Sequence, residues 1–372
     1  MQKNASPCSC VAAYWRNPPM RLPRCLSPVG WIPEKTRIAQ FSQRRRRAPS
    51  TCATLPGMAP RVAIGVPTYC KAHHVGDALR SLLAQTFRDF VLVVVDDASD
   101  DGTADVAEQL ARRDPRITVV RNAVRLGMPR NQRRALTLAR ERAPEAEFFA
   151  WGSDHDLWEP EWLARLVAVL DAEPGTVLVM PRAAAIDEHG RPSGRKRWKA
   201  LNTTGIEDPV ERLEAVLRER AAGNAVYGLF RIEPLLQGIG FRQTVLSDRP
   251  LVCEVALHGH IRLVDEPLWH RRVAEGGIAR QRRTAFPDGV PLIHRLVTPA
   301  WVHGAILFDD LVVRGRGRPR VGRLLGARAV ARYLRLEVRH PWRKAIRRRL
   351  NRIIEPLLGG LQALRRGRTT RR

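Results

Sequence analysis

The sequence predicts an α/β fold in which a mostly parallel β-sheet carries helices on both faces. Two observations support this. Apolar runs of strand length alternate with stretches of helical spacing from residue 61 to residue 181, and acidic clusters directly follow several of the strand-like runs. Strict alternation of strand and helix is typical of parallel sheets. Ligands of such sheets bind beyond the carboxyl ends of the strands, so the acidic clusters mark the predicted ligand-binding edge.

The expected elements follow from the hydrophobic period of each segment. Short apolar runs rich in β-branched residues predict buried strands, and apolar residues recurring every three or four positions predict helices. The expected strands are 61–67, 90–97, 116–122, 147–154 and 176–181. The expected helices are 75–86, 103–113, 129–142 and 160–171. Beyond them the pattern is weaker until a helix that opens at Asp248 and ends at Gly259, followed by a strand over 261–269.

The positive charge is concentrated at the two ends of the chain. The 372 residues have a formal net charge of +27, of which 1–57 contribute +9 and 311–372 contribute +18. The 34 basic and 34 acidic residues of 58–310 cancel. A neutral core argues against a nucleic-acid-binding surface on the folded part, so no nucleic-acid partner is expected.

Composition divides the chain into three regions. Residues 1–57 are rich in Pro, Arg and Ser without periodicity, which predicts a disordered leader, and Met58 is an alternative start. Residues 58–275 form the predicted globular domain, and 276–372 form an Arg-rich helical region. No apolar run approaches the length of a membrane span, and the six cysteines lack zinc-site spacing. Reduced thiols predict a cytoplasmic protein.

The acidic turn 95–103 follows a buried strand. Asp97, and after it Asp96, are the candidates for contact with a nucleoside, because a carboxylate at this edge can accept hydrogen bonds from a base or ribose. The alternative is a solvated turn and helix cap, where Asp is favoured in any case.

A second acidic loop lies in 151–163, where Asp154 and Asp156 stand two residues apart after the fourth expected strand. Carboxylates in this arrangement can hold Mg²⁺ or Mn²⁺, which takes oxygen ligands and often bridges phosphates. A pair of aspartates at this spacing is common by chance, and its position at a strand end is what favours a metal site.

Four segments together resemble the successive motifs of family 2 glycosyltransferases. They are PTYCK (67–71), VVVDDASDDGT (93–103), RLGMPRNQRRALTLAR (125–140) and SDHDLWEPEWL (153–163). The resemblance covers about 120 residues strongly and continues more weakly to about residue 275. It implies the fold called GT-A, a nucleotide-sugar donor, and an inverting, metal-assisted transfer.

The resemblance also implies roles for individual residues. The implied nucleotide-sugar contacts are Pro67, Tyr69, Asp97, Arg130, Asn131 and Asp154, and the implied metal motif is Asp154 and Asp156. The chain departs from the family at Cys70, where Asn is common, and at His155, where another Asp is common. His270 corresponds to a region in which some relatives place a further metal ligand; the alternative is a structural or exposed imidazole.

Inverting transfer needs a base that takes the proton of the acceptor hydroxyl. The resemblance places this carboxylate in 245–272, and Asp248 is the candidate. The alternative role of Asp248 is to cap the helix that it opens, in which case Glu254 is the substitute base. Ser247 stands where the family more often has an acid.

The basic C-terminal region repeats apolar residues at helical spacing opposite an Arg-rich face. The stripe consists of Trp342, Ile346, Leu350, Ile353, Leu357, Leu361 and Leu364. This pattern favours a helix on an anionic membrane surface, which would place the protein at the inner face of the plasma membrane. Packing on the globular domain and binding of another acidic partner are the alternatives.

The predicted function is transfer of a hexose from a nucleotide diphosphate sugar to a hydroxyl of a glycan or lipid-linked acceptor in cell-envelope polysaccharide or glycolipid synthesis. Nucleotidyltransferases are disfavoured, because PTYCKAHH stands where they carry a Gly-rich phosphate loop. A non-catalytic protein that binds a sugar nucleotide or acceptor on the same scaffold remains an alternative.

Overall fold

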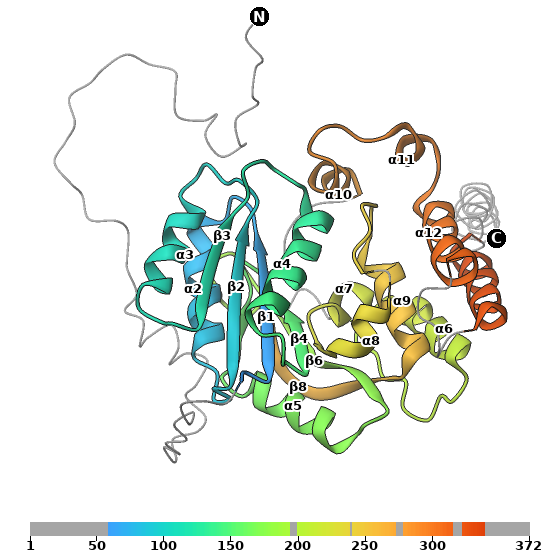
Figure 1. Ribbon diagram of the computed structural model, residues 1–372, viewed down its shortest axis with the longest axis horizontal. Coiled ribbons are helices and arrows are strands. Elements are labelled where there is room, and N and C mark those ends of the chain that lie inside the picture. Colours follow the sequence, from blue (N-terminus) through green and yellow to red (C-terminus); the bar gives the residue numbers. More distant parts are fainter. Residues whose placement is uncertain (1–58, 194–198, 239, 273–277, 315–321, 339–372) are drawn as a thin grey trace, which may run out of the picture.

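A computed structural model describes residues 59–193, 199–238, 240–272, 278–314 and 322–338 (Figure 1). The predicted disordered leader and the apolar stripe of 342–364 lie outside the described residues. Within the described part, no helix combines the length and the apolar character needed to cross a bilayer.

The centre of the molecule is a sheet of eight strands in the order β3-β2-β1-β4-β7-β6-β8-β5. The strands are β1 (Val62–Thr68), β2 (Phe90–Asp96), β3 (Ile117–Arg121), β4 (Phe148–Trp151), β5 (Leu157–Trp158), β6 (Thr176–Ile186), β7 (Leu229–Arg231) and β8 (His260–Arg272).

The sheet is mostly parallel, as predicted. The neighbours β3, β2, β1 and β4 are parallel to one another, and β6 is parallel to β8. Two strands run the other way: β7 lies antiparallel between β4 and β6, and β5 is antiparallel to β8. Sequence periodicity did not predict β5 and β7, because strands of two and three residues are too short to produce an alternating or apolar run.

Helices cover both faces of the sheet, which confirms the predicted layers. They are α2 (Ala72–Leu83), α3 (Thr103–Ala111), α4 (Met128–Arg142), α5 (Trp162–Ala172), α6 (Pro209–Glu219), α7 (Ala222–Ala225), α8 (Ile232–Gln237), α9 (Asp248–His258), α10 (Ile278–Ala285), α11 (Leu292–Leu296), α12 (Pro299–Phe308), the π-helical turn η1 (Asp309–Val313) and a helix over 323–338. Figure 1 shows α2 and α3 on one side of the sheet and α4 on the other.

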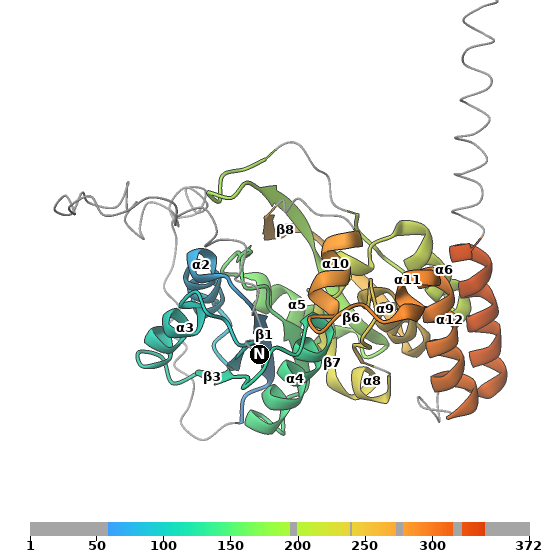
Figure 2. The same ribbon diagram turned by 90° about the horizontal axis from the view of Figure 1, so that it is seen from above.

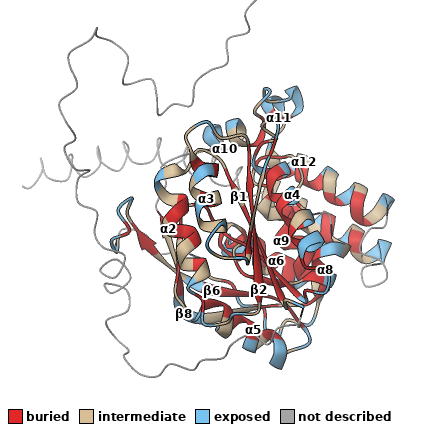
Figure 3. Ribbon diagram, turned by 60° about the vertical axis from the view of Figure 1, so that its left-hand side comes forward, coloured by how far each residue is buried: buried red, intermediate tan, exposed pale blue. Residues whose placement is uncertain are grey.

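Strand β2 shows why a fully apolar run was needed at the centre of the sheet. Val93 and Val95 belong to the apolar cluster under α4, whereas Leu92 and Val94 belong to the cluster under α2 and α5. Successive side chains of a strand point to opposite faces, and both faces are covered here, so every position of β2 is buried. Figure 3 shows this strand and its neighbours as the buried interior of the molecule.

The C-terminal helices pack against the rest of the fold as far as residue 338. Helix α12, η1 and the helix over 323–338 lie side by side next to α6 (Figure 2), and Leu307, Leu311 and Tyr333 join the apolar cluster under α4. The predicted helical C-terminal region is therefore present, and its first part packs within the chain.

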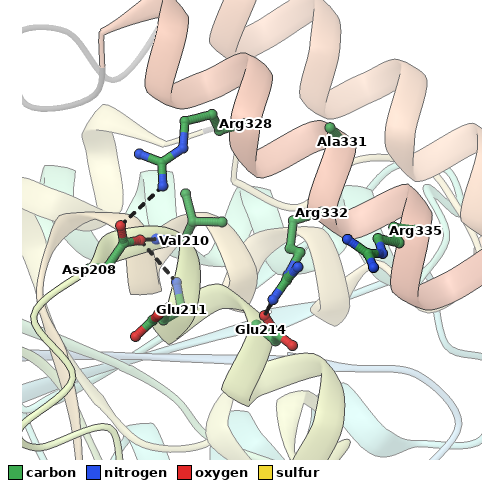
Figure 4. Close-up of a pocket in the computed structure, with 8 residues that line it drawn as sticks. All are labelled: Asp208, Val210, Glu211, Glu214, Arg328, Ala331, Arg332 and Arg335. Atoms are coloured by element: carbon green, nitrogen blue, oxygen red, sulfur yellow. Dashed lines mark hydrogen bonds and ion pairs between the residues drawn. The ribbon is translucent and has the colours of Figure 1, made fainter.

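Ion pairs join the last described helix to α6 across a shallow groove (Figure 4). Arg328 lies 3.2 Å from Asp208, which also caps α6, and Arg332 pairs with the buried carboxylate of Glu214. Three arginines of one helix thus face the acidic side of α6, which accounts for part of the basic character of this region without an outside partner.

Candidate functional site

The candidate site lies at the carboxyl ends of β1, β2 and β4, where the acidic loops were expected. The loop after β1 is tied to the loop after β2 by three backbone amides. Cys70 donates to Ser99 Oγ (2.9 Å), Lys71 to Thr103 Oγ1 (2.7 Å) and Ala72 to an Asp101 carboxylate oxygen (3.1 Å). The hydrogen bonds hold the two loops together as one rim.

Asp97 is buried and anchors a third loop. Its carboxylate accepts hydrogen bonds from Asn122 Nδ2 (2.9 Å) and from the backbone amides of Leu126 (2.7 Å) and Gly127 (2.9 Å). Gly127 has φ of +85° and lies directly before α4, a backbone conformation that favours glycine. Asp97 therefore fixes the entry to α4 against β2, and its contact with a nucleoside stays a prediction.

The neighbouring predicted residues have different surroundings. Asp96 is buried and accepts a hydrogen bond from the Ser99 amide (2.9 Å). Asn131 is buried between β2 and the Asn122 side chain, donating to the Val95 carbonyl (2.8 Å) and accepting from Asn122 (2.9 Å). Arg130 is exposed on α4. In this Arg-Asn pair, the Asn131 side chain holds α4 to β2, and the Arg130 side chain faces solvent.

An aromatic side chain with a cation above it stands on the first loop. The guanidinium carbon of Arg125 lies 4.0 Å from the centroid of the Tyr69 ring, within the range of a cation–π contact. Pro67, at the end of β1, pairs in register with Val95. Arg125 was not singled out in the sequence, because one arginine among 64 basic residues carries no signal of its own.

The second acidic loop brings an imidazole between the two aspartates. His155 Nδ1 lies 2.6 Å from Asp154 Oδ1, and its Nε2 lies 3.8 Å from Asp156 Oδ1. Burial on its own would raise the pKa of the Asp154 carboxyl, but the hydrogen bond and charge of His155 outweigh it and lower that pKa. Asp154 is therefore held as a carboxylate.

Asp156 is also bonded to β8. Its Oδ2 accepts from Trp269 Nε1 (3.1 Å) and its Oδ1 accepts from the Arg272 backbone amide (2.8 Å). The side chain is 1% exposed. Asp156 thus joins the acidic loop to a strand more than a hundred residues further along the chain, and each oxygen keeps one lone pair for a further partner.

His270 does not join this pair of aspartates. Its Nε2 lies 2.6 Å from Glu159 Oε1. Neighbouring side chains of a strand point to opposite faces, so a Trp269 that faces Asp156 turns His270 away. Among the described residues, no group of three or more His, Cys, Asp or Glu side chains is arranged to hold a metal ion. The predicted role of His270 as a ligand therefore has no geometric support in the described part.

Asp248 opens α9 at the border of the same site. Burial raises the pKa of its carboxyl, and the charges of Arg249 and Arg271 only partly oppose this. Gly223 lies against it, since a Cβ added there would stand 3.0 Å from Asp248 Oδ2. The preceding Leu246 has φ of +58°, a strained value for a residue with a branched side chain.

Three carboxylates from different segments act electrostatically on Tyr227. Burial raises the pKa of this phenol first, and the negative charges of Asp156, Asp154 and Asp248 raise it further. All three carboxylates thus lie within electrostatic reach of one phenol, whose ring also lies 5.0 Å from that of Trp269. The charges of Asp154, Asp156 and Asp248 thus act on one buried tyrosine that the sequence pattern did not indicate, and the roles predicted for the three carboxylates stay predictions.

The structure also shows the surroundings of two further ionisable groups, Glu254 and His74. Glu254 is fully buried, and its carboxylate faces Gly238 after α8, so it is not placed to serve in the stead of Asp248. His74, on α2, has a pKa lowered to about 4 by burial and by the positive charges of Arg272, Lys71 and His155. A neutral imidazole thus lies within reach of the acidic loop.

The C-terminal helices hold the segment that precedes Asp248. Asp310 of η1 accepts two hydrogen bonds of 2.6 Å from Arg242 Nη2. His303 lies 2.8 Å from the Val245 carbonyl and 2.7 Å from the Tyr333 hydroxyl. Burial lowers the pKa of His303 to about 4, so the neutral ring donates from Nε2 to the carbonyl and accepts at Nδ1 from the hydroxyl.

Replacing Asp310 by Ala should lower the free energy of unfolding by about 2–3 kcal/mol, because the half-buried Arg242 then loses its carboxylate partner. Urea denaturation measures the difference. The matched control is Asp309→Ala, whose exposed pair with Arg314 is worth at most about 0.5 kcal/mol. Equal destabilisation by the two variants would show that the Arg242–Asp310 contact adds no more stability than the exposed pair of Asp309 with Arg314.

Comparison with known proteins gives consistent results. The family model described as "Glycosyl transferase family 2" matches residues 63–224. The putative glycosyltransferase EpsH of Bacillus subtilis (strain 168) is 28% identical over 242 residues, which are 63% of this chain and 67% of the relative. The putative teichuronic acid biosynthesis glycosyltransferase TuaG of the same organism is 30% identical over 106 residues, which are 28% of this chain and 40% of the relative.

A solved structure shares the fold. The crystal structure of S. aureus TarS 1–349 in complex with UDP-GlcNAc superimposes with a TM-score of 0.50 at 18% identity, over 67% of each chain. The chain spans between 19% and 40% of the length of four curated relatives that it matches, TuaG among them.

Proposed function

Because residues 63–224 are a family 2 glycosyltransferase domain, we propose that this protein transfers a hexose from a nucleotide diphosphate sugar to a hydroxyl group, with inversion at the anomeric carbon. The observation that carries the proposal is the acidic loop after β4, where Asp154 and Asp156 flank His155, together with the buried Asp248, whose charge acts on the same tyrosine as theirs. An enzyme of this kind needs a site for a diphosphate and a base for an acceptor, and the three carboxylates can serve both.

The nucleoside would lie on the rim made by the first three loops. Tyr69 offers an aromatic face held by Arg125, Pro67 forms the end of β1, and Asp96 and Asp97 stand at the end of β2. The exposed guanidinium of Arg130 would approach the phosphates from α4. Carboxylates that are already fixed by hydrogen bonds bind a nucleoside at low entropic cost, because no side chain has to be ordered on binding.

A divalent cation, Mg²⁺ or Mn²⁺, fits the acidic loop when the donor supplies further ligands. Asp154 is a carboxylate whose Oδ2 accepts a long hydrogen bond of 3.3 Å from the Tyr69 amide, and Asp156 keeps one lone pair per oxygen. One or two carboxylates completed by phosphate oxygens and water is the set that Mg²⁺ takes at nucleotide sites. The bound ion would offset charge on the departing diphosphate, and Lys71 would add a positive charge beside Asp154.

Asp248 would act as the general base. Its raised pKa makes the carboxylate a stronger proton acceptor than an exposed aspartate, and the charge of Arg271 opposes that rise only in part. A hydroxyl that loses its proton to Asp248 attacks the anomeric carbon while the diphosphate leaves on the other side, which inverts the configuration.

The acceptor would be a glycan or a lipid-linked saccharide of the cell envelope. One relative supports this choice, since TuaG is described as a putative teichuronic acid biosynthesis glycosyltransferase. We propose a cytoplasmic enzyme, in which the free thiols of Cys70 and Cys253 stay reduced, with 58–275 as the catalytic domain and 276–372 as its basic helical extension.

The proposal is tested by incubating the full chain with UDP-, dTDP- and GDP-sugars and Mn²⁺ or Mg²⁺ while released nucleoside diphosphate is followed. One donor is expected to be hydrolysed slowly, and Asp154→Ala should reduce the rate at least about hundredfold. EDTA should have the same effect. The matched control is Asp171→Ala, which removes an exposed carboxylate of α5 that pairs with Arg61.

Two other results would point elsewhere. Tight binding of a nucleotide sugar by calorimetry, with no release of nucleoside diphosphate in the presence of extracts that contain acceptors, would indicate a non-catalytic binding protein. Full activity of Asp154→Ala would contradict the assignment of the acidic loop to the donor diphosphate.

A further inference from the structure

A cluster of exposed apolar side chains stands on α11 and the start of α12. Leu292, Ile293, Leu296 and Trp301 are 66%, 53%, 75% and 52% exposed. Four such side chains lie within ten consecutive residues, whereas single exposed apolar residues scattered over a surface are normal. A local cluster of this kind requires an explanation beyond random exposure.

The fold holds this cluster outward. Helix α11 is fixed through His294, which is buried and whose ring lies 4.6 Å from that of Phe286. With His294 on the inner side, the apolar neighbours at 292, 293 and 296 face solvent. Figure 1 shows α10 and α11 projecting beyond the sheet, and Figure 3 shows α11 as an exposed element at the edge of the molecule.

Arginines border the cluster. Residues 278–308 contain Arg280, Arg282, Arg283 and Arg295 but a single acid, Asp288. Arg283 and Arg295 are exposed, and neither forms an ion pair within the described part of the chain. Leucine, isoleucine and tryptophan next to unpaired arginines are the composition of interfacial elements, in which apolar side chains enter the acyl boundary and guanidinium groups meet lipid phosphates.

We infer that residues 292–301, with Arg283 and Arg295, form a docking surface for an anionic lipid bilayer. This surface is separate from the amphipathic stripe of 342–364. It does not depend on the proposed enzymatic activity, because binding to lipid is measured without turnover.

The docking surface is continuous with the donor side of the candidate site. Ala285, the last residue of α10, and Pro287 lie so close to Gly127 that a Cβ added there would stand 2.8 Å from an atom of each. Val124, on the same loop as Gly127, and Met128, the first residue of α4, are 66% and 43% exposed. Bilayer contact at α11 would therefore bring the lipid surface next to the loop that Asp97 anchors.

Flotation of the full chain with vesicles tests the inference. The vesicles contain phosphatidylcholine and phosphatidylglycerol at roughly three to one, and the ionic strength is high enough to reduce the Debye length to about 3 Å, which suppresses binding by basic segments alone. The double variant Leu292→Glu, Leu296→Glu should lower the partition coefficient at least about tenfold. Leu324→Glu, which alters a leucine that is 80% exposed on the last described helix, is the matched control.

A second readout locates the contact. Vesicles with brominated acyl chains should quench part of the tryptophan emission, and this part should disappear in Trp301→Phe. Equal partition of the double variant and the control, quenching of the same amplitude in Trp301→Phe as in the unaltered chain, or no binding by the unaltered chain would each overturn the inference. A dimer that the double variant converts to a monomer, with vesicle binding unchanged, would overturn it in favour of a second copy of the chain.

Discussion

Asp248→Asn is expected to lower the rate of glycosyl transfer by about 10²–10⁴-fold, the range that a positioned general base contributes. The amide keeps the size of the side chain but cannot accept the acceptor proton. Binding of the donor nucleotide should stay within about twofold of the unaltered protein, because Asp248 lies outside the rim of Tyr69 and Asp97. Initial rates with saturating donor, together with calorimetric titration of the nucleotide, measure the two effects.

The pH dependence of the rate and stability of the unaltered protein and of Asp248→Asn gives an independent test. Because the pKa of Asp248 is raised in the folded protein, the unaltered rate should rise with pH through a limb above the ordinary range of an aspartate. A raised pKa contributes stability that is present below the unfolded value and is lost as pH rises through the folded value. Asp248→Asn should therefore unfold at a higher temperature than the unaltered protein at neutral pH, with no such advantage in acid.

The control for this variant is Glu233→Gln, an exposed carboxylate on α8, which should change neither rate nor melting temperature. A rate within tenfold of normal in Asp248→Asn would assign the carboxylate to capping of α9 alone. Loss of both nucleotide binding and thermal stability would show that the residue supports the fold and leave another group as the base.

Asp97→Ala is expected to weaken nucleotide binding at least about hundredfold, close to 3 kcal/mol. The substitution removes the acceptor of three hydrogen bonds, from Asn122 and from the amides of Leu126 and Gly127. The entry to α4 then loses its attachment to β2, and the buried amides lose their partner, which costs about 1–3 kcal/mol for each unsatisfied group. Titration with UDP and GDP in the presence of Mn²⁺ measures the affinity, and urea denaturation measures the accompanying loss of stability.

The matched control for this variant lies in the same turn. Asp100 is exposed, and its carboxylate is 3.6 Å from Cys70 Sγ, so Asp100→Ala should bind nucleotide within about threefold of the unaltered protein. Nucleotide affinity in Asp97→Ala that matches the control would mean that neither this carboxylate nor the loop that it anchors belongs to the donor site.

The predictable part of the fold is the part with a strong local period. Strands such as β2 are covered on both faces and must be apolar throughout, so their position can be found from composition alone. Strand β7 contributes three residues between β4 and β6, and its pairing is decided by the surrounding tertiary structure. No local signal distinguishes Leu229–Arg231 from a turn, which is why the antiparallel insertion was not expected.

The residues of the candidate site also divide into those that the local sequence predicts and those that depend on contacts between distant segments. Asp97, Asp154 and Asp156 could be located because each follows a strand, and the end of a parallel strand is a known edge of the sheet. Contacts between distant segments could not be located. The bond from Trp269 to Asp156 turns His270 toward Glu159, and Tyr227 reaches the carboxylates from a segment with no motif. The pairing of Asn131 with Asn122 also depends on how α4 meets β2.

Hydrogen bonds and ion pairs join the C-terminal helices to Arg242, Val245 and Arg249. These contacts affect the order in which the parts of the candidate site form during synthesis. Asp97 and Asp154 lie within residues 63–224, which leave the ribosome first. The segment on either side of Asp248 receives its partners His303, Asp310 and Glu337 only when the later helices have emerged. An unfinished chain can thus assemble the half proposed to hold the nucleotide before the half proposed to take the proton. The second half is completed only by residues of 303–337.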